Sequence, residues 1–287
     1  MISVFKREFK SYFTGVVGCL FIAFLLCFTG IYVTSINLRG GYASFEYVLS
    51  NIIIVFLLIV PLLTMRSFAE EKHTKTDRLL YSLPMSVTEV VLGKYLAMLA
   101  VFAIPVLIMA LYPVLLSAFG YMAYRSAYLA LFAFFILGAA LIALGMFMSS
   151  LTESQVISAV ISFGALLLMY MMNGVASLVP SGASSSLVCF CILALVIGLI
   201  TYAMTKNTAV SVCVFCVLTA ALVALYLIDS SVFAGLFGSL LTYLAVFDRF
   251  IELTGGIFDI TAIIYLITFA VFFIYLTVQS VEKRRWS

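Results

Sequence analysis

The amino-acid sequence predicts an all-α protein that spans a membrane as a polytopic helix bundle. Of its 287 residues, 66% are hydrophobic and only 9% are charged, whereas soluble domains carry about 25% charged residues. A surface so poor in charge cannot face water, so its solvent must be lipid. The hydrophobic residues form continuous runs and do not alternate with polar ones, which excludes a transmembrane β-barrel.

Eight apolar runs are long enough to cross the hydrocarbon core, for which a helix needs about 20 residues. Ionisable side chains are absent from the middle of these runs, where each would cost about 2.5–3.5 kcal/mol. Pro61 and Pro105 fit the assignment because membrane helices tolerate proline. We therefore predict spans at residues 16–36, 48–65, 95–118, 127–149, 155–173, 187–205, 208–228 and 261–280.

The distribution of positive charge predicts that both termini face the cytoplasm. With the N-terminus inside, only Arg39, Arg125 and Arg249 of the 15 lysines and arginines fall outside, as the positive-inside rule favours. This orientation requires an even number of spans. A six-span arrangement also satisfies the rule, because a hairpin 187–228 that does not cross fully would move only Lys206 outside.

Residues 1–15 precede the first span and are predicted to form an amphipathic helix in the cytoplasmic interface. Phe5, Phe9 and Phe13 share one helix face, while the basic residues between them favour another. The alternative is an ordinary basic flank to the first span. The first apolar run lacks an Ala-x-Ala-like cleavage site, so we interpret it as a span and not as a cleaved signal peptide.

Charge is concentrated in residues 66–94, the only sizeable cytoplasmic segment that the spans leave. Glu71 and Lys75 form an i,i+4 pair in the stabilising orientation, which favours a helix, and Pro84 should end it. An apolar patch beside these charges consists of Leu79, Leu80 and Leu83. Such a helix suits docking into the cleft of a partner protein; the alternative is a solvated connecting loop.

The same segment reads Phe68-Ala-Glu-Glu-Lys, then Thr76-Asp-Arg-Leu-Leu-Tyr-Ser-Leu-Pro84, then Glu89-Val-Val-Leu-Gly-Lys94-Tyr. These stretches resemble the coupling-helix region of type-2 ABC exporter permeases. Two departures occur: Lys75 stands where that family often has glycine, and Asp77-Arg78 replaces a Leu-Glu pair. The resemblance implies that a separate ATPase subunit docks on Phe68, Glu70, Glu71, Thr76, Asp77, Leu79, Leu80 and Pro84.

Two other stretches agree with this resemblance. Residues 144–155 look like the family's short turn between spans four and five. Residues 250–265 and 280–286 are similar to permeases of the gliding-motility subfamily, as is the N-terminal Phe-Lys-Arg-Glu-Phe-Lys-Ser-Tyr-Phe. Family members often have six spans, so residues 187–228 would be an additional pair.

No Gly-x-x-x-x-Gly-Lys-Ser/Thr phosphate loop occurs in the sequence, so the chain is not expected to hydrolyse ATP itself. The resemblance implies that ATP and Mg²⁺ bind to the partner ATPase and that this chain holds no cofactor. It also implies a second permease chain, identical or related. Membrane lipid is the other expected partner, and nucleic acid is not expected. A bacterial cytoplasmic (inner) membrane is the expected location.

Enzyme chemistry is disfavoured because the spans supply no convergent histidines, carboxylates or metal ligands. His73, the single histidine, is interpreted as a loop residue. The Cys213/Cys216 pair lies within an apolar run and is interpreted as small apolar residues in a helix. An ion-coupled secondary carrier or channel is the main alternative, although ion-coupled carriers usually hold ionisable groups at the midplane. A membrane scaffold that moves no cargo is another.

Residues 229–260 are predicted to form a short re-entrant or interfacial helix on the outer side, because apolar residues recur there at helical spacing. The alternative is that these residues rest among the lipid headgroups. The whole chain, residues 1–287, is expected to be one permease domain. Its apolar spans suit hydrophobic, lipid-like or peptide cargo, and export is implied by the resemblance alone.

Overall fold

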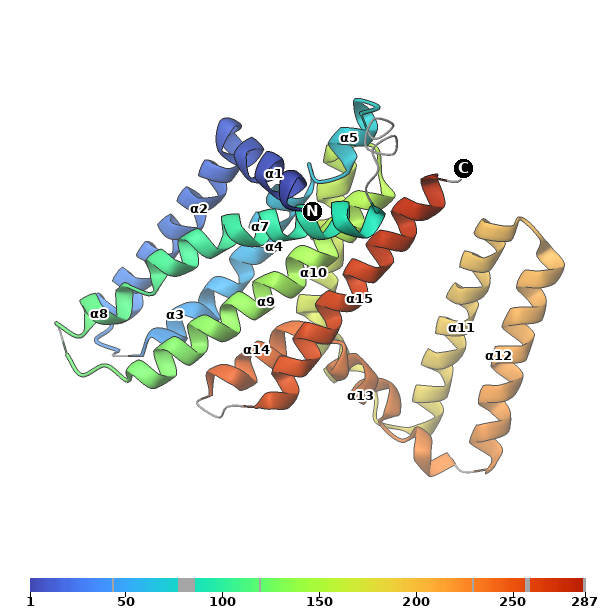
Figure 1. The fold of residues 1–287 in the computed structure, drawn as a ribbon. Coiled ribbons are helices and arrows are strands. Elements are labelled where there is room, and N and C mark those ends of the chain that lie inside the picture. Colours follow the sequence, from blue (N-terminus) through green and yellow to red (C-terminus); the bar gives the residue numbers. More distant parts are fainter. Residues whose placement is uncertain (43, 77–85, 119, 229, 256–258, 286–287) are drawn as a thin grey trace. The chain divides into compact units, whose positions relative to one another are not determined.

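The computed structural model of the chain describes residues 1–42, 44–76, 86–118, 120–228, 230–255 and 259–285 (Figure 1). Every regular element in these ranges is a helix, which confirms the all-α fold class. Seven described helices are long and apolar enough to cross a membrane, and each overlaps one predicted span. The chain is therefore a multi-pass membrane protein. These helices are Val16–Arg39, Phe45–His73, Val87–Leu116, Tyr124–Leu151, Gln155–Leu178, Thr208–Ile228 and Ile260–Arg284.

The remaining predicted span, 187–205, falls in α11 (Ala183–Thr205). This helix is 23 residues long, and its stretch Ala183–Leu199 is apolar. Helices α11 and α12 (Thr208–Ile228) form a helical hairpin, as predicted for residues 187–228. That this hairpin crosses the membrane, and so that there are eight spans rather than six, stays a prediction.

The chain divides into two compact units, one of residues 1–168 with 246–287 and one of residues 169–245. The first unit contains most of the helices and the charged segment. It consists of α1 (Ile2–Thr14), α2 (Val16–Tyr32), the π-helix η1 (Val33–Arg39), α3 (Phe45–Ile52), the 3₁₀ turn η2 (Ile53–Val55), α4 (Phe56–Thr64), α5 (Ala69–His73), α7 (Val87–Met109), α8 (Tyr112–Leu116), α9 (Tyr124–Leu151), the first part of α10 (Gln155–Leu178), α14 (Val246–Thr254) and α15 (Ile260–Arg285).

Helix α9 lies at the centre of the first unit, against α15 on one side and against α4 and α7 on the other (Figure 1). Its glycines let neighbouring side chains approach closely. A Cβ atom on Gly138 would stand 2.3 Å from the Phe102 ring, and one on Gly145 would stand 2.4 Å from Thr64 Oγ1. Small residues at such contacts are typical of membrane helix packing, because dispersion contacts replace the hydrophobic effect there.

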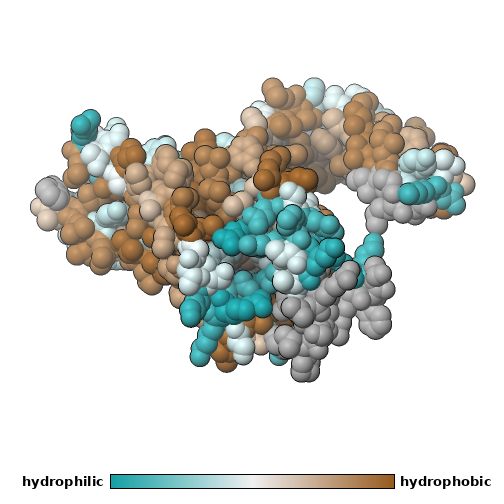
Figure 2. Space-filling view, turned by 90° about the horizontal axis from the view of Figure 1, so that it is seen from above, coloured by the Kyte–Doolittle hydropathy of each residue, from teal (hydrophilic) through white to brown (hydrophobic). Residues whose placement is uncertain are grey.

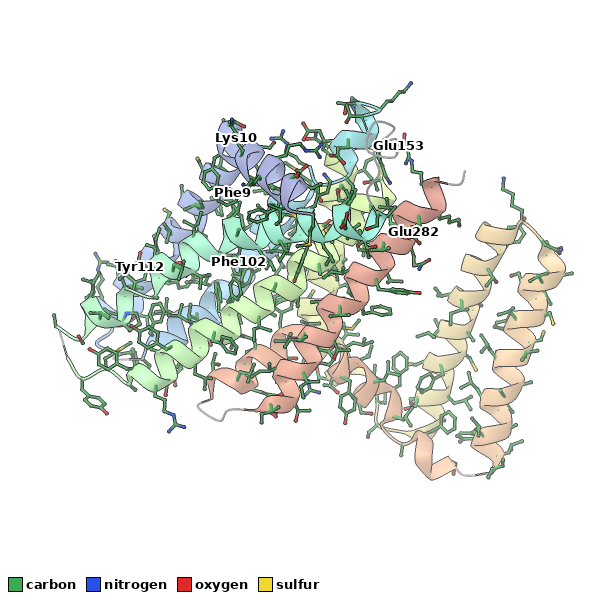
Figure 3. All side chains as sticks on the ribbon, viewed as in Figure 1. Phe9, Lys10, Phe102, Tyr112, Glu153 and Glu282 are labelled. Atoms are coloured by element: carbon green, nitrogen blue, oxygen red, sulfur yellow. The ribbon has the colours of Figure 1, made fainter. Side chains whose placement is uncertain are left out.

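Aromatic rings fill the core of the first unit. Phe102 of α7 lies where α7 packs on α9 (Figure 3), and its ring centroid is 5.8 Å from that of Phe56 and 6.1 Å from that of Phe134. Phe56 and Phe134 are themselves 4.7 Å apart. Tilted and edge-on ring pairs at these distances are favourable beyond the area they bury, so this cluster holds α4, α7 and α9 together.

Helix α7 extends further toward the N-terminus than the third predicted span. The span is predicted from residue 95, but α7 begins at Val87. The Ser86 hydroxyl accepts a hydrogen bond from the Glu89 amide at 3.2 Å, and Ser-Val-Thr-Glu is the sequence of a capping box. The helix starts eight residues early because this cap, and not hydrophobicity, sets its beginning.

The second unit contains the end of α10, the hairpin α11–α12, the 3₁₀ turn η3 (Ser230–Phe233) and α13 (Leu236–Tyr243). Phe190 of α11 packs edge-on against Phe233 and Phe237, at 6.2 and 5.1 Å between ring centroids. Residues 229–260 thus hold two short α-helices among the described residues, α13 and α14, where one helix is predicted. Helix α14 buries Phe247, Phe250 and Leu253 in the first unit.

Candidate functional site

Many charged residues of the first unit gather at the end where α1, α5 and the start of α7 meet. Figure 2 views the protein from this end and shows hydrophilic side chains clustered there, while apolar side chains cover most of the other visible surface. Helix α1 carries Phe5, Phe9 and Phe13 in one row, with neighbouring ring centroids 5.8 and 5.0 Å apart. This row confirms that the three phenylalanines share a helix face; the interfacial position of α1 stays a prediction.

Four charged side chains form a closed ring between α1, α5 and α7. Arg7 Nη2 lies 2.7 Å from Glu8 Oε1 and 3.0 Å from Glu71 Oε1. Lys94 Nζ lies 3.2 Å from Glu8 Oε1 and 2.9 Å from Glu71 Oε1. Cations and anions alternate around this ring, so its formal charge is zero. We call Arg7, Glu8, Glu71 and Lys94 the ion ring.

Lys94 is the most buried member of the ion ring, with 2% of its side chain exposed. Besides its two carboxylate partners, its ammonium donates a hydrogen bond to the Ser67 carbonyl at 2.8 Å. It also lies 5.1 Å from the centre of the Phe68 ring. A lysine ammonium has three donors, and three oxygen acceptors surround this one. The buried charge is therefore compensated by charge and by hydrogen bonds, as a buried ion requires.

The Glu8 carboxylate is held ionised by its neighbours. Burial alone would raise the pKa of Glu8, but the positive charges of Lys94 and Arg7 and their hydrogen bonds outweigh it and lower the pKa below its ordinary value. Glu8 belongs to α1, whereas Lys94 belongs to α7. Their ion pair therefore fastens the N-terminal helix to the third span.

The start of α5 is anchored to the end of α9. The Ser149 hydroxyl accepts hydrogen bonds from the amides of Phe68 and Ala69, at 3.1 and 3.2 Å, and donates one to the Met65 carbonyl at 3.2 Å. Lys72 donates to the carbonyl of Ser150. These contacts satisfy backbone amides that would otherwise be orphaned at the helix start. A side chain far along the sequence thus sets the position of the charged segment.

The end of α5 is closed by a Schellman motif. The Thr76 amide donates to the Glu71 carbonyl at 3.0 Å, and the Lys75 amide donates to the Lys72 carbonyl at 3.2 Å. Lys75 takes the left-handed conformation, with φ of 57°. Glycine is the usual residue at this position of the motif. This explains in physical terms why the resembling permeases often have glycine where this chain has Lys75.

The predicted docking residues fall into different environments. Phe68 is only 5% exposed and packs inside the unit. Glu71 belongs to the ion ring and pairs with Arg7 and Lys94; an ion pair with Lys75 is not among those of the described residues, contrary to the predicted i,i+4 pair. Glu70 is half-buried and binds Arg66 through two hydrogen bonds of 2.7 and 2.9 Å.

At the end of α5, the residues His73, Thr74, Lys75 and Thr76 are exposed. Of the predicted docking residues that the structure describes, Thr76 is the exposed one. Asp77, Leu79, Leu80 and Pro84 lie outside the described residues, so their docking role stays a prediction. Among the described residues, no group of three His, Cys, Asp or Glu side chains is placed to hold a metal ion.

Sequence reasoning missed the residues that organise this site. The sequence predicts Ser149 only as part of a short turn, and Glu8 only as part of the amphipathic N-terminal helix. Their signal is weak because each acts through a partner distant in sequence. Lys94 does carry a signal: it is a charge about two turns inside a largely apolar helix, where it needs a partner.

A second contact closes the same end of the unit. Arg284, near the end of α15, donates to Glu153 in the turn between α9 and α10, at 2.7 Å. Figure 3 labels Glu153 and Glu282 near this end of the bundle. The Ser280 hydroxyl reaches the carbonyl of Ser150 at 3.5 Å, the same carbonyl that Lys72 binds. The end of α9 and the turn that follows it therefore join α5 to the C-terminal helix.

Comparison with known protein families gives one match. Residues 29–187 match the model of a family described as "ABC-2 family transporter protein". This range includes α5, α7, α9 and the described part of the charged segment. No curated protein and no solved structure matches the chain.

Proposed function

Because the chain belongs to the ABC-2 family of transporter proteins, and is thus the non-catalytic membrane permease of an ABC transporter working with an ABC ATPase, we propose that it is an exporter permease. In this proposal the ATPase docks on residues 66–94. ATP and Mg²⁺ bind to that partner, and closure of the ATPase dimer rocks the spans as rigid bodies. The permease acts as a dimer, with itself or with a related chain, in a bacterial inner membrane.

The observation that carries the docking proposal is the way in which the charged segment is held. Its first helix is fixed at one end by Ser149 and closed at the other by the Schellman motif at Lys75. A short helix that must transmit force needs such anchoring, whereas a solvated loop does not. The exposed residues 73–76 then form the start of the surface that meets the ATPase, and the leucines at 79 and 80 are expected to continue it.

The cargo is proposed from the chemistry of the spans. Their middle sections carry no ionisable side chain in the sequence, which suits hydrophobic, lipid-like or peptide cargo better than ions. The transport direction follows the resemblance to exporters. A carrier that works alone would instead give flux from the purified chain without ATP, and a scaffold would bind partners without cargo-stimulated turnover.

Co-purification tests the proposal. The tagged chain is purified from its native membrane, and partners are identified by mass spectrometry. Wild type is expected to bring down a phosphate-loop ATPase, and Leu79→Asp with Leu80→Asp is expected to lose it. The matched control is Tyr121→Asp with Tyr124→Asp, two exposed aromatic residues in the turn before α9 and at its first position, outside the predicted spans. Absence of an ATPase from folded wild-type chain would overturn the proposal.

A further inference from the structure

The ion ring links the docking segment to two other helices. Arg7 and Glu8 come from α1, Glu71 from α5, and Lys94 from α7. Each carboxylate oxygen of the ring bridges the same two cations, Arg7 and Lys94. Movement of α5 away from α7 would therefore break contacts to both α1 and α7. The ion ring therefore joins three helices, and none of them can move away without breaking contacts to the other two.

Packing around Lys94 leaves little freedom for α1. A Cβ atom on the adjacent Gly93 would stand 3.1 Å from Val4 Cβ and 3.1 Å from the Met1 carbonyl, so α1 crosses α7 at close range. The Tyr12 hydroxyl, also on α1, donates to the Leu63 carbonyl at the end of α4, at 3.1 Å. Helix α1 is thus held at both ends, and the ion ring lies between these two contacts.

We propose that Lys94 is a positioning residue for coupling, which makes α1, α5 and the start of α7 move as one body when the ATPase displaces α5. This inference rests on the proposed function and deepens it. Lys94 has no contact with the ATPase in this account. It acts by converting a force on a short surface helix into a displacement of a whole span and of the N-terminal helix.

Burial favours Lys94, and not Arg7, as the tie between these helices. Lys94 is 2% exposed, whereas Arg7 is 53% exposed. Exposed ion pairs exchange readily with water and contribute little, but the desolvated Lys94 ammonium keeps only the Ser67 carbonyl and the Phe68 ring as partners once its carboxylates move away. Separation of α5 from α7 is therefore strongly opposed at Lys94 and weakly opposed at Arg7.

A charge-balanced variant separates positioning from simple stabilisation. Lys94→Met with Glu8→Gln removes one cation and one anion, and it leaves the Arg7–Glu71 pair in place. The matched control is Arg249→Met with Glu252→Gln, which removes an ion pair of 2.9 Å on α14. Both variants are reconstituted in lipid nanodiscs with the ATPase. Spin labels at His73→Cys and Thr88→Cys, in a chain whose six native cysteines are alanine, report the separation of α5 and α7.

The wild type and the control are expected to show one narrow His73–Thr88 distance distribution, both without nucleotide and with ATP and vanadate. The Lys94→Met/Glu8→Gln variant should still bind the ATPase. Its distance distribution should broaden, and stimulation of ATPase turnover by the permease should fall about tenfold, within the usual range of coupling free energies. Glu8→Gln alone, which leaves Lys94 paired with Glu71, should fold normally and show a smaller loss.

A narrow distribution together with full stimulation in both Glu8→Gln and the double variant would overturn the positioning role of Lys94. So would a wild-type distance that itself changes with nucleotide, since α5 and α7 would then not move as one body. Failure of wild-type chain to bind any ATPase is a different result and overturns the proposed function.

Discussion

Lys94 Nζ lies 2.9 Å from Glu71 Oε1 in the described structure, with the lysine almost fully buried. Lys94 belongs to α7, and Glu71 belongs to the short helix α5 that precedes it. This ion pair holds α5, at the start of the charged segment, against α7, the helix that follows the segment. It makes the segment part of the bundle, and the predictions below follow from this arrangement and its neighbours.

Loss of Lys94 alone should be far more damaging than loss of a surface partner. Lys94→Met leaves Glu8 and Glu71 half-desolvated with only Arg7 between them, and breaking such a buried pair costs about 3–5 kcal/mol. Arg284→Met, which removes the partner of the exposed Glu153, should cost less than about 1 kcal/mol. Unfolding of both variants in mixed micelles measures the difference. Equal costs would contradict the buried role of Lys94.

Acidification should release α1. The pKa of Glu8 is lower in the folded chain than its ordinary value of 4.5, so its contribution to stability is fully present above that value. It is lost as pH falls through the lower, folded-state pKa. Protease accessibility of α1, followed from pH 7 downward, should rise in this acidic range. In Glu8→Gln, the protease accessibility of α1 should depend less on pH than in wild type. The same pH dependence in both proteins would contradict this prediction.

Ser149→Ala should loosen α5. The substitution leaves the buried amides of Phe68 and Ala69 without their acceptor, which costs about 1–3 kcal/mol. Ser177→Ala is a suitable control because that exposed hydroxyl bonds only to Gly174 within its own helix. Hydrogen exchange at residues 68–73 is expected to accelerate in Ser149→Ala and to stay unchanged in Ser177→Ala. Protection that survives the first change would show that Ser149 does not anchor this helix.

Lys75→Gly should stabilise the chain. The left-handed backbone of Lys75 costs a non-glycine residue roughly 1 kcal/mol, which glycine avoids. Thr74→Gly, one position earlier at φ of −82°, should stabilise nothing, since that conformation suits any residue. Thermal unfolding in detergent compares the two. A lower melting temperature for Lys75→Gly than for wild type would contradict the Schellman assignment.

The spans could be predicted from the sequence because hydrophobic run length is a direct consequence of the bilayer. Residues 127–149 lie inside α9, and residues 208–228 match α12. The beginning of α7 could not be predicted in this way, because a serine cap at Ser86 begins the helix before the apolar run does. Hydropathy carries no information about such a cap.

The candidate site was predicted only in part, for a related reason. The sequence shows that charge is concentrated in residues 66–94. It also shows that Lys75 stands where the resembling permeases often have glycine. The pairing of Glu71 with α1 and α7, in place of Lys75, is not visible, because several carboxylates and cations nearby could pair in many ways. Only the packing of α1 across Gly93 brings Glu8 to Lys94.

Site-specific photocrosslinking in native membranes tests the central claim most directly. A photoreactive amino acid replaces the exposed Thr76 or, as the control, Tyr121, which is 87% exposed and precedes α9 at its other end. The account predicts an adduct with a phosphate-loop ATPase at Thr76 and none at Tyr121. An ATPase adduct at Tyr121, or none at Thr76 in a complex that retains the ATPase, would contradict docking on residues 66–94.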